Sequence, residues 1–267
     1  MRHFSGFAWL FVGIASLLSL APVAAAEPLR VGVAEADITP PPGFPMAGYY
    51  HERLATGQRD PLKAKAIVFR SDRSVAAWVV CDLTGVARDL CVAVRREAAE
   101  KTGIPPQQIV VSATHSHTAP DYSRDLYDYL SDKAPPPDRP AYAAKLIQGA
   151  VDAIVKANAA AQPSSLECGT AQQATPVSFN RRFVMKDGSV RTWQRLDGPD
   201  VLRAAGPIDA EIGLLLVRSL ESRAPRGLVS SFALHLATVG GLQWSGDYPY
   251  FIEQALRRQL GEPLVSL

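Results

Sequence analysis

Residues 109–119 read IVVSATHSHTA, a short apolar run that leads into two histidines. The run is β-branched and follows Pro105-Pro106, which predicts a buried strand. Two histidines two positions apart on a strand, or on its extended continuation, point to the same face. We therefore expect the imidazoles of His115 and His117 to lie side by side where the strand ends. Ligand sites concentrate at such strand ends in layered α/β proteins.

The segments around this strand predict an α/β fold, with a layered mixed β-sheet core flanked by helices. The helices show apolar residues at the 3.6-residue period, and the strands are short apolar or alternating runs. Residues 122–140 contain three consecutive prolines and form an irregular stretch, long enough for a lid or substrate-side loop. A polar loop is expected from residue 180, with a turn at Lys186-Asp187-Gly188. The expected strands are 29–34, 63–69, 75–81, 109–113, 166–177, 212–218 and 228–234, and the expected helices are 88–101, 141–158 and 248–260.

Residues 1–26 predict a secretory signal peptide. Residues 7–20 are apolar and uncharged, and Ala24-Ala25-Ala26 fits a cleavage site. The apolar stretch is short for a membrane span, which makes an uncleaved anchor the less favoured interpretation. We expect residues 27–267 to be secreted or periplasmic and to form one domain, because about 240 residues suit a single α/β domain.

Charge and cysteine content argue against two kinds of site. The formal net charge is +2 and falls to +1 without Arg2, and no basic stripe with interleaved aromatic residues is present. This balance predicts no nucleic-acid partner. The cysteines are Cys81, Cys91 and Cys168, an odd number without metal-site spacing. We interpret them as structural residues.

Histidines at strand ends point to a metal site. Neutral imidazole is a good zinc ligand, and a catalytic zinc ion takes three protein ligands and keeps one position for water. His115 and His117 supply two ligands, or one ligand and one acid/base group. His235 follows the expected strand 228–234, so it could reach the same ion. The plainer alternative for each histidine is a hydrogen-bonded structural residue.

Asp82 directly follows the expected strand 75–81, so it also lies at the end of a strand. Three roles stay open for it: a metal ligand, a group that orients an imidazole, or a cap for the loop that follows.

Familiar alternatives to a strand-end metal site are absent from the sequence. It contains no His-Glu-x-x-His helix, no Gly-x-Ser-x-Gly turn and no phosphate-binding loop, and the histidine pair is not followed by Asp and His as in metallo-β-lactamases.

Several short motifs lie in order between Val31 and about Leu260. They are Ala36-Asp37-Ile38-Thr39-Pro40, Gly48-Tyr49, Cys81-Asp82-Leu83-Thr84-Gly85, Ser112-Ala113-Thr114-His115-Ser116-His117, Ala233-Leu234-His235 and Ser245-Gly246-Asp247. Together they resemble the neutral/alkaline, non-lysosomal ceramidase family. The Ser-Ala-Thr-His-x-His element is the most specific of them.

The resemblance implies a secreted or membrane-surface zinc amidase that cleaves the N-acyl bond of ceramide to give sphingosine and a fatty acid. It implies one zinc ion, with His115 as the first ligand and His235 as the second. His117 resembles the active-site histidine beside the metal. Arg181 resembles the active-site arginine that contacts the substrate or the developing oxyanion, and Arg182 is the alternative for this role.

The resemblance also implies a catalytic domain that is incomplete at its C-terminus. In the family, a Gly-Asp-rich segment with an active-site serine follows the matched region, and so do the Glu and Tyr that complete the zinc shell. The remaining zinc ligands are therefore expected beyond Leu267, and the chain is expected to be the N-terminal part of a longer catalytic domain. Two other functions stay open: a metal-dependent hydrolase of another amide or ester, and a degenerate, non-catalytic exported binding module.

Overall fold

The computed structural model describes residues 27–122, 139–175, 177–261 and 263–267. The predicted signal peptide and most of the predicted irregular stretch lie outside the described residues. The helices are α1 (Arg88–Thr102), α3 (Arg139–Ala159) and α4 (Tyr248–Leu260), with a 3₁₀ turn η1 (Pro106–Gln108). The strands are β1 (Arg30–Asp37), β2 (Gly57–Gln58), β3 (Lys63–Arg70), β4 (Val75–Cys81), β5 (Ile109–Ala113), β6 (Gln162–Gln172), β7 (Arg182–Met185), β8 (Val190–Thr192), β9 (Val201–Ala204), β10 (Glu211–Ser219), β11 (Pro225–Ser231), β12 (Gln243–Trp244) and β13 (Val265–Ser266).

Eight strands form one mixed sheet in the order β13-β11-β10-β6-β1-β3-β4-β5. Neighbours pair antiparallel except β4 with β5 and β11 with β13, which are parallel. The sequence prediction of a layered mixed sheet flanked by helices is confirmed. The β3–β4 hairpin, the strand β5 and the three helices all lie where the sequence pattern places them.

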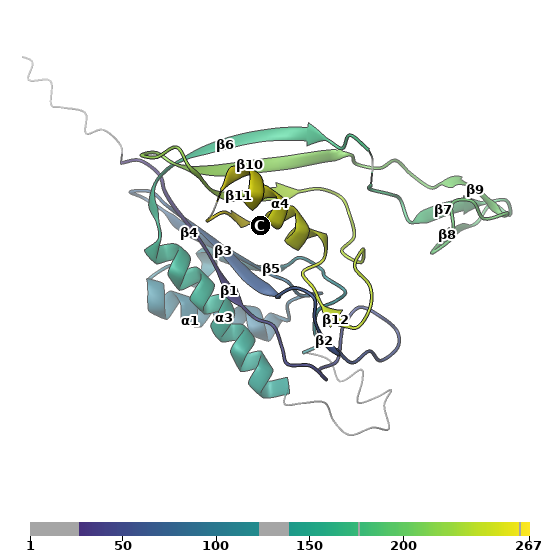
Figure 1. Ribbon diagram of the computed structural model, residues 1–267, viewed down its shortest axis with the longest axis horizontal. Helices are drawn as coiled ribbons and strands as arrows, with labels where there is room; N and C mark the ends of the chain where they lie inside the picture. Colours follow the sequence, from purple (N-terminus) through teal and green to yellow (C-terminus); the bar gives the residue numbers. More distant parts are fainter. Residues whose placement is uncertain (1–26, 123–138, 176, 262) are drawn as a thin grey trace, which may run out of the picture.

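The sheet is covered on both faces. Helices α1 and α3 lie together against one face, on the side of β1 and β3 (Figure 1). Alternate residues of β3, namely Ala64, Ala66 and Val68, point into the apolar core with these helices. Lys65 lies between them in sequence and points the other way, where its ammonium pairs with Glu253 of α4. Helix α4 therefore covers the opposite face.

Buried charges fix α4 to the sheet. Glu253 is 3% exposed and accepts from Lys65, which is 5% exposed. Arg257, one turn further along α4, lies 2.5 Å from Glu253 and 3.3 Å from Glu35 of β1. Removing one partner of such a buried pair typically costs about 3–5 kcal/mol, because the other charge stays buried without compensation.

Among the described helices, none has the length and apolar character needed to cross a lipid bilayer.

The predicted polar loop from residue 180 is instead a small antiparallel sheet in the order β8-β7-β9. This sheet projects from the ends of β6 and β10 (Figure 1). The predicted turn is present, because Gly188 adopts φ +82° and its N–H donates to the Met185 carbonyl at 3.0 Å. The strands on either side of the turn are only three or four residues long. Strands this short show no readable alternation of apolar and polar residues, so the prediction missed them.

The three cysteines are free and differ in burial. Cys81 is fully buried at the end of β4, and burial raises the pKa of its thiol. Cys91 is half-buried on α1, and Cys168 is exposed on β6. Burial agrees with a structural role for Cys81 and in part for Cys91, whereas Cys168 lies at the surface.

We predict that Gly32→Ala lowers the free energy of unfolding by about 1–3 kcal/mol, because overpacking forces the backbone to move. A Cβ on Gly32 of β1 would overlap the Ala157 carbonyl of α3. The matched control is Gly169→Ala on β6, where a Cβ meets no atom within 4 Å. This control should change stability by less than about 0.5 kcal/mol. Urea unfolding followed by circular dichroism measures both, and equal midpoints would contradict the close packing of β1 on α3.

Candidate metal centre

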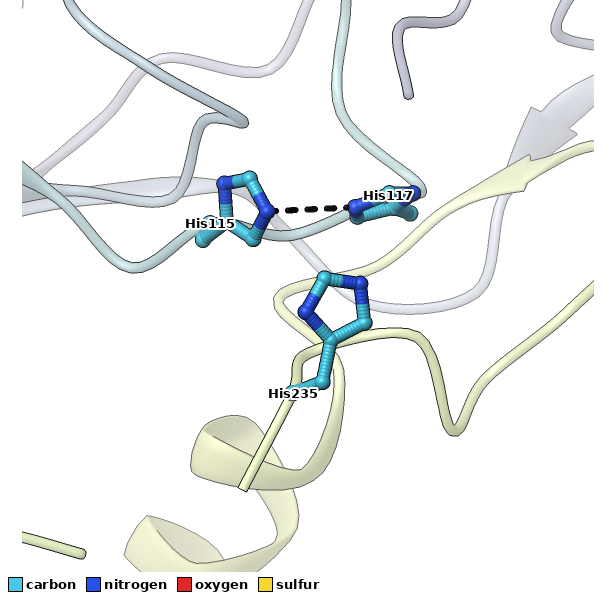
Figure 2. A group of neighbouring side chains, drawn as sticks. All are labelled: His115, His117 and His235. Carbon is cyan, nitrogen blue, oxygen red and sulfur yellow. Dashed lines mark hydrogen bonds between the residues drawn. The ribbon is translucent and has the colours of Figure 1, made fainter. Parts of the chain in front are cut away.

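The loop after β5 carries the first two histidines on a backbone that is not extended. His115 has φ +76°, in the left-handed region. The His115 and Ser116 N–H groups both donate to the Leu83 carbonyl, at 2.9 and 3.1 Å, and this holds the turn. The two imidazoles nevertheless meet, with their Nε2 atoms 3.3 Å apart (Figure 2). The prediction that the rings lie side by side is confirmed, but strand alternation was the wrong reason for it.

His235 reaches the same place from a loop. The predicted strand 228–234 ends earlier, since β11 stops at Ser231. The chain then turns, with the Leu234 N–H donating to the Phe232 carbonyl at 3.1 Å. The His117 N–H donates to the Leu236 carbonyl at 3.0 Å and joins the two histidine loops directly. His235 therefore does not share the setting of a residue just past a strand, although its ring lies where the prediction placed it.

The three imidazoles form one cluster (Figure 2). One ring nitrogen from each of His115, His117 and His235 lies within 4.8 Å of the other two. The ring centroids are 4.9 Å apart for His115 and His117, 5.0 Å for His115 and His235, and 4.6 Å for His117 and His235. Among the described residues this is the group of histidine, cysteine and acidic side chains that could hold a metal ion.

A hydrogen bond at the far side of its ring sets the tautomer of His115. His115 Nδ1 lies 2.7 Å from the Thr84 carbonyl oxygen, and a carbonyl only accepts, so this nitrogen carries the proton. The unprotonated Nε2 of the neutral His115 ring then faces His117 Nε2 at 3.3 Å. A hydrogen bond to the Gly48 backbone raises the pKa of His117, against the larger effect of burial.

The donor set fits a tetrahedral metal ion. With metal–nitrogen bonds of about 2.0–2.1 Å, ligand nitrogens in a tetrahedral site lie about 3.3–3.4 Å apart. The 3.3 Å between His115 Nε2 and His117 Nε2 matches that edge, and His235 lies within a small side-chain movement of it. Three neutral nitrogens also equal the number of protein ligands typical of a catalytic zinc site.

The surroundings favour the neutral form of His117 and His235. Burial lowers the pKa of His117 to about 4, and the neighbouring His235 and His115 add to this effect. Burial also lowers the pKa of His235, with further lowering from His115 and Arg181, while the Asp247 carboxylate raises it. Metal ligands must be deprotonated, so a low imidazole pKa makes binding less dependent on pH.

Two acidic residues of the quoted motifs, Asp82 and Asp247, do not join the cluster. Asp82 is 3% exposed, and its Oδ2 accepts from the Lys63 N–H at 2.9 Å. Burial raises the pKa of Asp82 to about 6, against the lowering effect of Lys65. Its side chain points to the sheet face covered by α4, so it is not a ligand of the histidine cluster. Asp247 instead caps α4, accepting from the Tyr248 N–H at 2.6 Å.

Arg181 lies beside the histidines, and Arg182 does not. Arg181 and His235 line one cavity of about 260 Å³, and the charge of Arg181 lowers the pKa of His235. Its guanidinium lies 5.2 Å from the centroid of the Trp193 ring. Arg182 begins β7 and is exposed, with its N–H donating to Asn180 Oδ1 at 3.0 Å.

A second cavity, of about 430 Å³, adjoins the cluster at His115 and His117. Its lining includes these two residues together with the aromatic and apolar side chains of Tyr49, Val86 and Tyr122. The three imidazoles therefore line two cavities, His235 that of Arg181 and the other two that of Tyr49.

Sequence reasoning missed two residues that position the histidines. Arg53 is 8% exposed and donates through Nη2 to the carbonyls of His117, at 2.5 Å, and Ala47, at 2.7 Å. Thr84 supplies the carbonyl that orients His115. Thr84 lies in the motif Cys81-Asp82-Leu83-Thr84-Gly85, so the sequence drew attention to this segment but not to the role of Thr84. Both contacts are made to backbone atoms from distant segments, so no residue pattern identifies them.

Comparison with known proteins identifies the family. The sequence model of the protein family described as "Neutral/alkaline non-lysosomal ceramidase, N-terminal" matches residues 29–241. The chain belongs to the neutral/alkaline non-lysosomal ceramidase family. The resemblance drawn from the ordered motifs is thereby confirmed. No curated protein sequence matches this ceramidase-family chain.

Solved ceramidase structures share the fold. The neutral ceramidase from Pseudomonas aeruginosa superposes with a TM-score of 0.69 at 20% identity, over 90% of this chain and 38% of that one. A structure described as "Ceramidase complexed with C2" gives a TM-score of 0.68 at 20% identity, over 90% and 37%. This ceramidase-family chain thus spans about 38% of the length of the structures it matches. The likeness confirms the mixed α/β architecture.

We predict that Gly48→Ala reduces zinc affinity by more than about 10-fold, because the new Cβ overlaps the His117 imidazole and pushes this ring against the ligand His115, whose Nε2 lies 3.3 Å from His117 Nε2. Gly43→Ala is the matched control on the same loop. Both glycines have positive φ, +91° and +82°, so each substitution costs about 1–2 kcal/mol of backbone strain. A Cβ at Gly43 meets nothing within 4 Å, so zinc affinity should stay unchanged there. Competition with a chelating dye measures both, and equal affinities would contradict the placement of His117.

We predict that the metal-free protein loses stability as the pH falls from about 6.5 to about 4. The pKa of His117 is lowered from an ordinary value of 6.5 to about 4 in the folded chain. The unfolded chain therefore binds the proton first, and protonation favours unfolding across this window. Above pH 6.5 this contribution is fully present. Urea unfolding in chelator should give a shallower decline for His117→Gln than for the wild type, and identical pH profiles would show that His117 titrates normally.

Proposed function

We propose that this chain is the catalytic region of a secreted, zinc-dependent amide hydrolase that cleaves N-acyl-sphingosine to sphingosine and a fatty acid. The observation that carries the proposal is the cluster of three imidazole nitrogens within 4.8 Å, built from the ordered motifs of a ceramidase-family chain. The geometry supports a metal site, and the family supports a lipid amide as substrate.

In the proposed site, His115 and His235 hold one zinc ion. Zinc, when bound, supplies a Lewis acid and lowers the pKa of a coordinated water to about 7. Thr84 fixes His115 with its Nδ1 protonated, so that Nε2 faces the cluster. The loop therefore presents His115 with the Nε2 lone pair directed toward the cluster.

His117 acts as the acid/base group. Because its pKa lies near 4, it is neutral at physiological pH and can accept a proton from the attacking water. It then gives that proton to the leaving nitrogen as the carbon–nitrogen bond breaks. Without this transfer the amine would have to leave as an unstable anion. All three rings lie close enough to share an ion, so the division of roles between His115 and His117 is part of the proposal.

Arg181 stabilises the oxyanion of the tetrahedral intermediate. Its guanidinium remains charged at any physiological pH and shares the cavity that also contains His235. Fixed positive charge near a developing oxyanion typically provides one of the largest contributions to acyl transfer.

The two cavities suit an amide with an apolar chain on each side. Ceramide carries an acyl chain and a sphingoid chain on opposite sides of its amide bond. The histidine cluster adjoins two cavities, one lined partly by Tyr49, Val86 and Tyr122 and the other lined partly by Phe179 and Leu234. This arrangement favours a two-chain lipid over a small soluble amide.

We also propose export and contact with a membrane surface. The apolar segment 7–20 and the alanines before Glu27 support a cleaved signal peptide. Apolar side chains are exposed on and near the β7–β9 sheet, where Trp193 is 70% exposed, Leu196 70% and Leu202 60%. Such a surface suits the headgroup region from which a lipid substrate is taken.

We predict that His115→Ala abolishes stoichiometric zinc and lowers hydrolysis of a fluorescent short-acyl ceramide to background. His117→Ala should retain zinc and lower the rate by about 10²–10⁴-fold, as expected for loss of an acid/base group. Metal analysis and product chromatography of both variants beside the wild type provide the readouts. Retained zinc in His115→Ala would refute the ligand assignment, and lost zinc in His117→Ala would make His117 a ligand.

A panel of substrates separates the alternatives. A soluble N-acyl amino acid and a nitrophenyl ester are compared with the ceramide at equal zinc occupancy. Preference for either soluble substrate would support a hydrolase of another amide or ester. A zinc-loaded wild type that turns over none of the three would support the non-catalytic binding module.

A further inference from the structure

A buried polar network joins the two loops that carry the histidines. Its centre is formed by the side chains of Asp60, Ser245 and Asp247, which are 2%, 0% and 0% exposed. Two of these residues stand in the motif Ser245-Gly246-Asp247, for which the proposed chemistry has no role. Buried polar groups at such a density are costly unless they are fully hydrogen-bonded, so their contacts indicate their purpose.

Ser245 anchors the loop of the first two histidines. Its carbonyl accepts from Ser116 Oγ at 2.8 Å and from Thr118 Oγ1 at 2.9 Å. Its N–H donates to the Thr118 carbonyl at 3.2 Å. Ser116 and Thr118 alternate with His115 and His117 along the chain and are fully buried. The hydroxyl groups of Ser116 and Thr118 thus fix the His115–His117 loop to Ser245, while the imidazoles face the cluster.

Asp60 holds Ser245 in place. Its carboxylate accepts from Ser245 Oγ at 2.5 Å and from the Gly246 N–H at 2.7 Å. The Asp247 N–H in turn donates to Ser245 Oγ at 3.0 Å. Asp60 itself follows β2, which pairs with β12 immediately ahead of Ser245. The hydroxyl of Ser245 therefore links the two carboxylate residues.

Asp247 anchors the loop of the third histidine. Its carboxylate accepts from the N–H groups of Thr238, at 3.0 Å, and Val239, at 2.9 Å, and from the Thr238 hydroxyl, at 2.5 Å. These partners lie three and four residues after His235. The same carboxylate caps α4 at Tyr248.

The backbone of Asp247 shows that this position is constrained by its surroundings. Its φ of 61° and ψ of −158° belong to a region that is essentially restricted to glycine. A residue with a side chain persists there only when surrounding contacts over-determine the conformation, and such residues cluster at functional sites. The Asp247 side chain supplies those contacts.

We propose that Asp60, Ser245 and Asp247 are positioning residues that hold the three imidazoles at metal-binding separation. We call these three side chains the Asp–Ser–Asp brace. The brace acts on the His115–His117 loop through Ser245 and on the His235 loop through Asp247. The inference rests on the proposed metal site, and its effect is exerted through the histidines. Loss of groups that orient metal ligands typically lowers metal affinity by about 10–100-fold.

The test compares Asp247→Asn with Glu253→Gln, and Ser245→Ala is the second variant of the brace. Asn keeps the shape of Asp, tolerates positive φ and removes one acceptor oxygen. Glu253 is the matched control because it is a carboxylate on the adjoining helix, 3% exposed, whose partners are Lys65 and Arg257. Each folded variant is titrated with Co²⁺, followed by its visible absorption, and with Zn²⁺ against a chelating dye. Nitrogen-15 spectra of the metal-free histidine rings are recorded in parallel.

Asp247→Asn and Ser245→Ala should lower Zn²⁺ affinity by about 10–100-fold, change the Co²⁺ spectrum and shift the ring signals of His117 and His235. Glu253→Gln should lower stability while leaving affinity, spectrum and ring signals as in the wild type. Wild-type affinity and unshifted ring signals in both brace variants would overturn the brace, as would equal losses in the control. A wild type that binds neither metal would refute the proposed metal-dependent function, whereas ring shifts confined to the brace variants would still show that the brace positions the imidazoles.

Discussion

The imidazoles of His115, His117 and His235 crowd within 4.8 Å of one another, and the surrounding structure disfavours the charged form of two of them. Burial and mutual repulsion lower the pKa of His117 and His235, and the carbonyl of Thr84 fixes the protonated nitrogen of His115. Low pKa values and the fixed tautomer of His115 together favour unprotonated nitrogens within the cluster. These contacts maintain the geometry in which the three side chains could hold a metal ion.

The sheet topology brings these contacts together. Parallel pairing of β4 with β5 sets Cys81 opposite Ala113, so the segments that follow both strands leave the sheet side by side. Thr84 therefore lies within reach of His115. The parallel pair β2–β12 does the same for Asp60 and Ser245, which both follow short strands of that pair. Two parallel pairings thus place the orienting groups beside the groups that they orient.

Local sequence pattern predicted the elements that depend on local physics. The strand β5, the β3–β4 hairpin and the three helices have clear apolar periodicity, and all are present. The ordered motifs contain His115, His117 and His235, whose rings meet in one cluster. The positive φ of His115 and the early end of β11 depend on hydrogen bonds from distant segments, which periodicity cannot show. Asp82 is an example of this limit, because position at a strand end does not reveal which face of the sheet a side chain meets.

The histidines that meet at the cluster come from opposite halves of the chain, separated by α3, β6 and β10. An unfolded chain therefore scatters these residues, and a metal ion held by His115 and His235 together would bind the native state alone. Free ion at 100 times its dissociation constant would then add about 2.7 kcal/mol to the stability of the fold. The supply of metal in the compartment where the chain folds would accordingly influence how much folded protein persists there, apart from any influence on turnover.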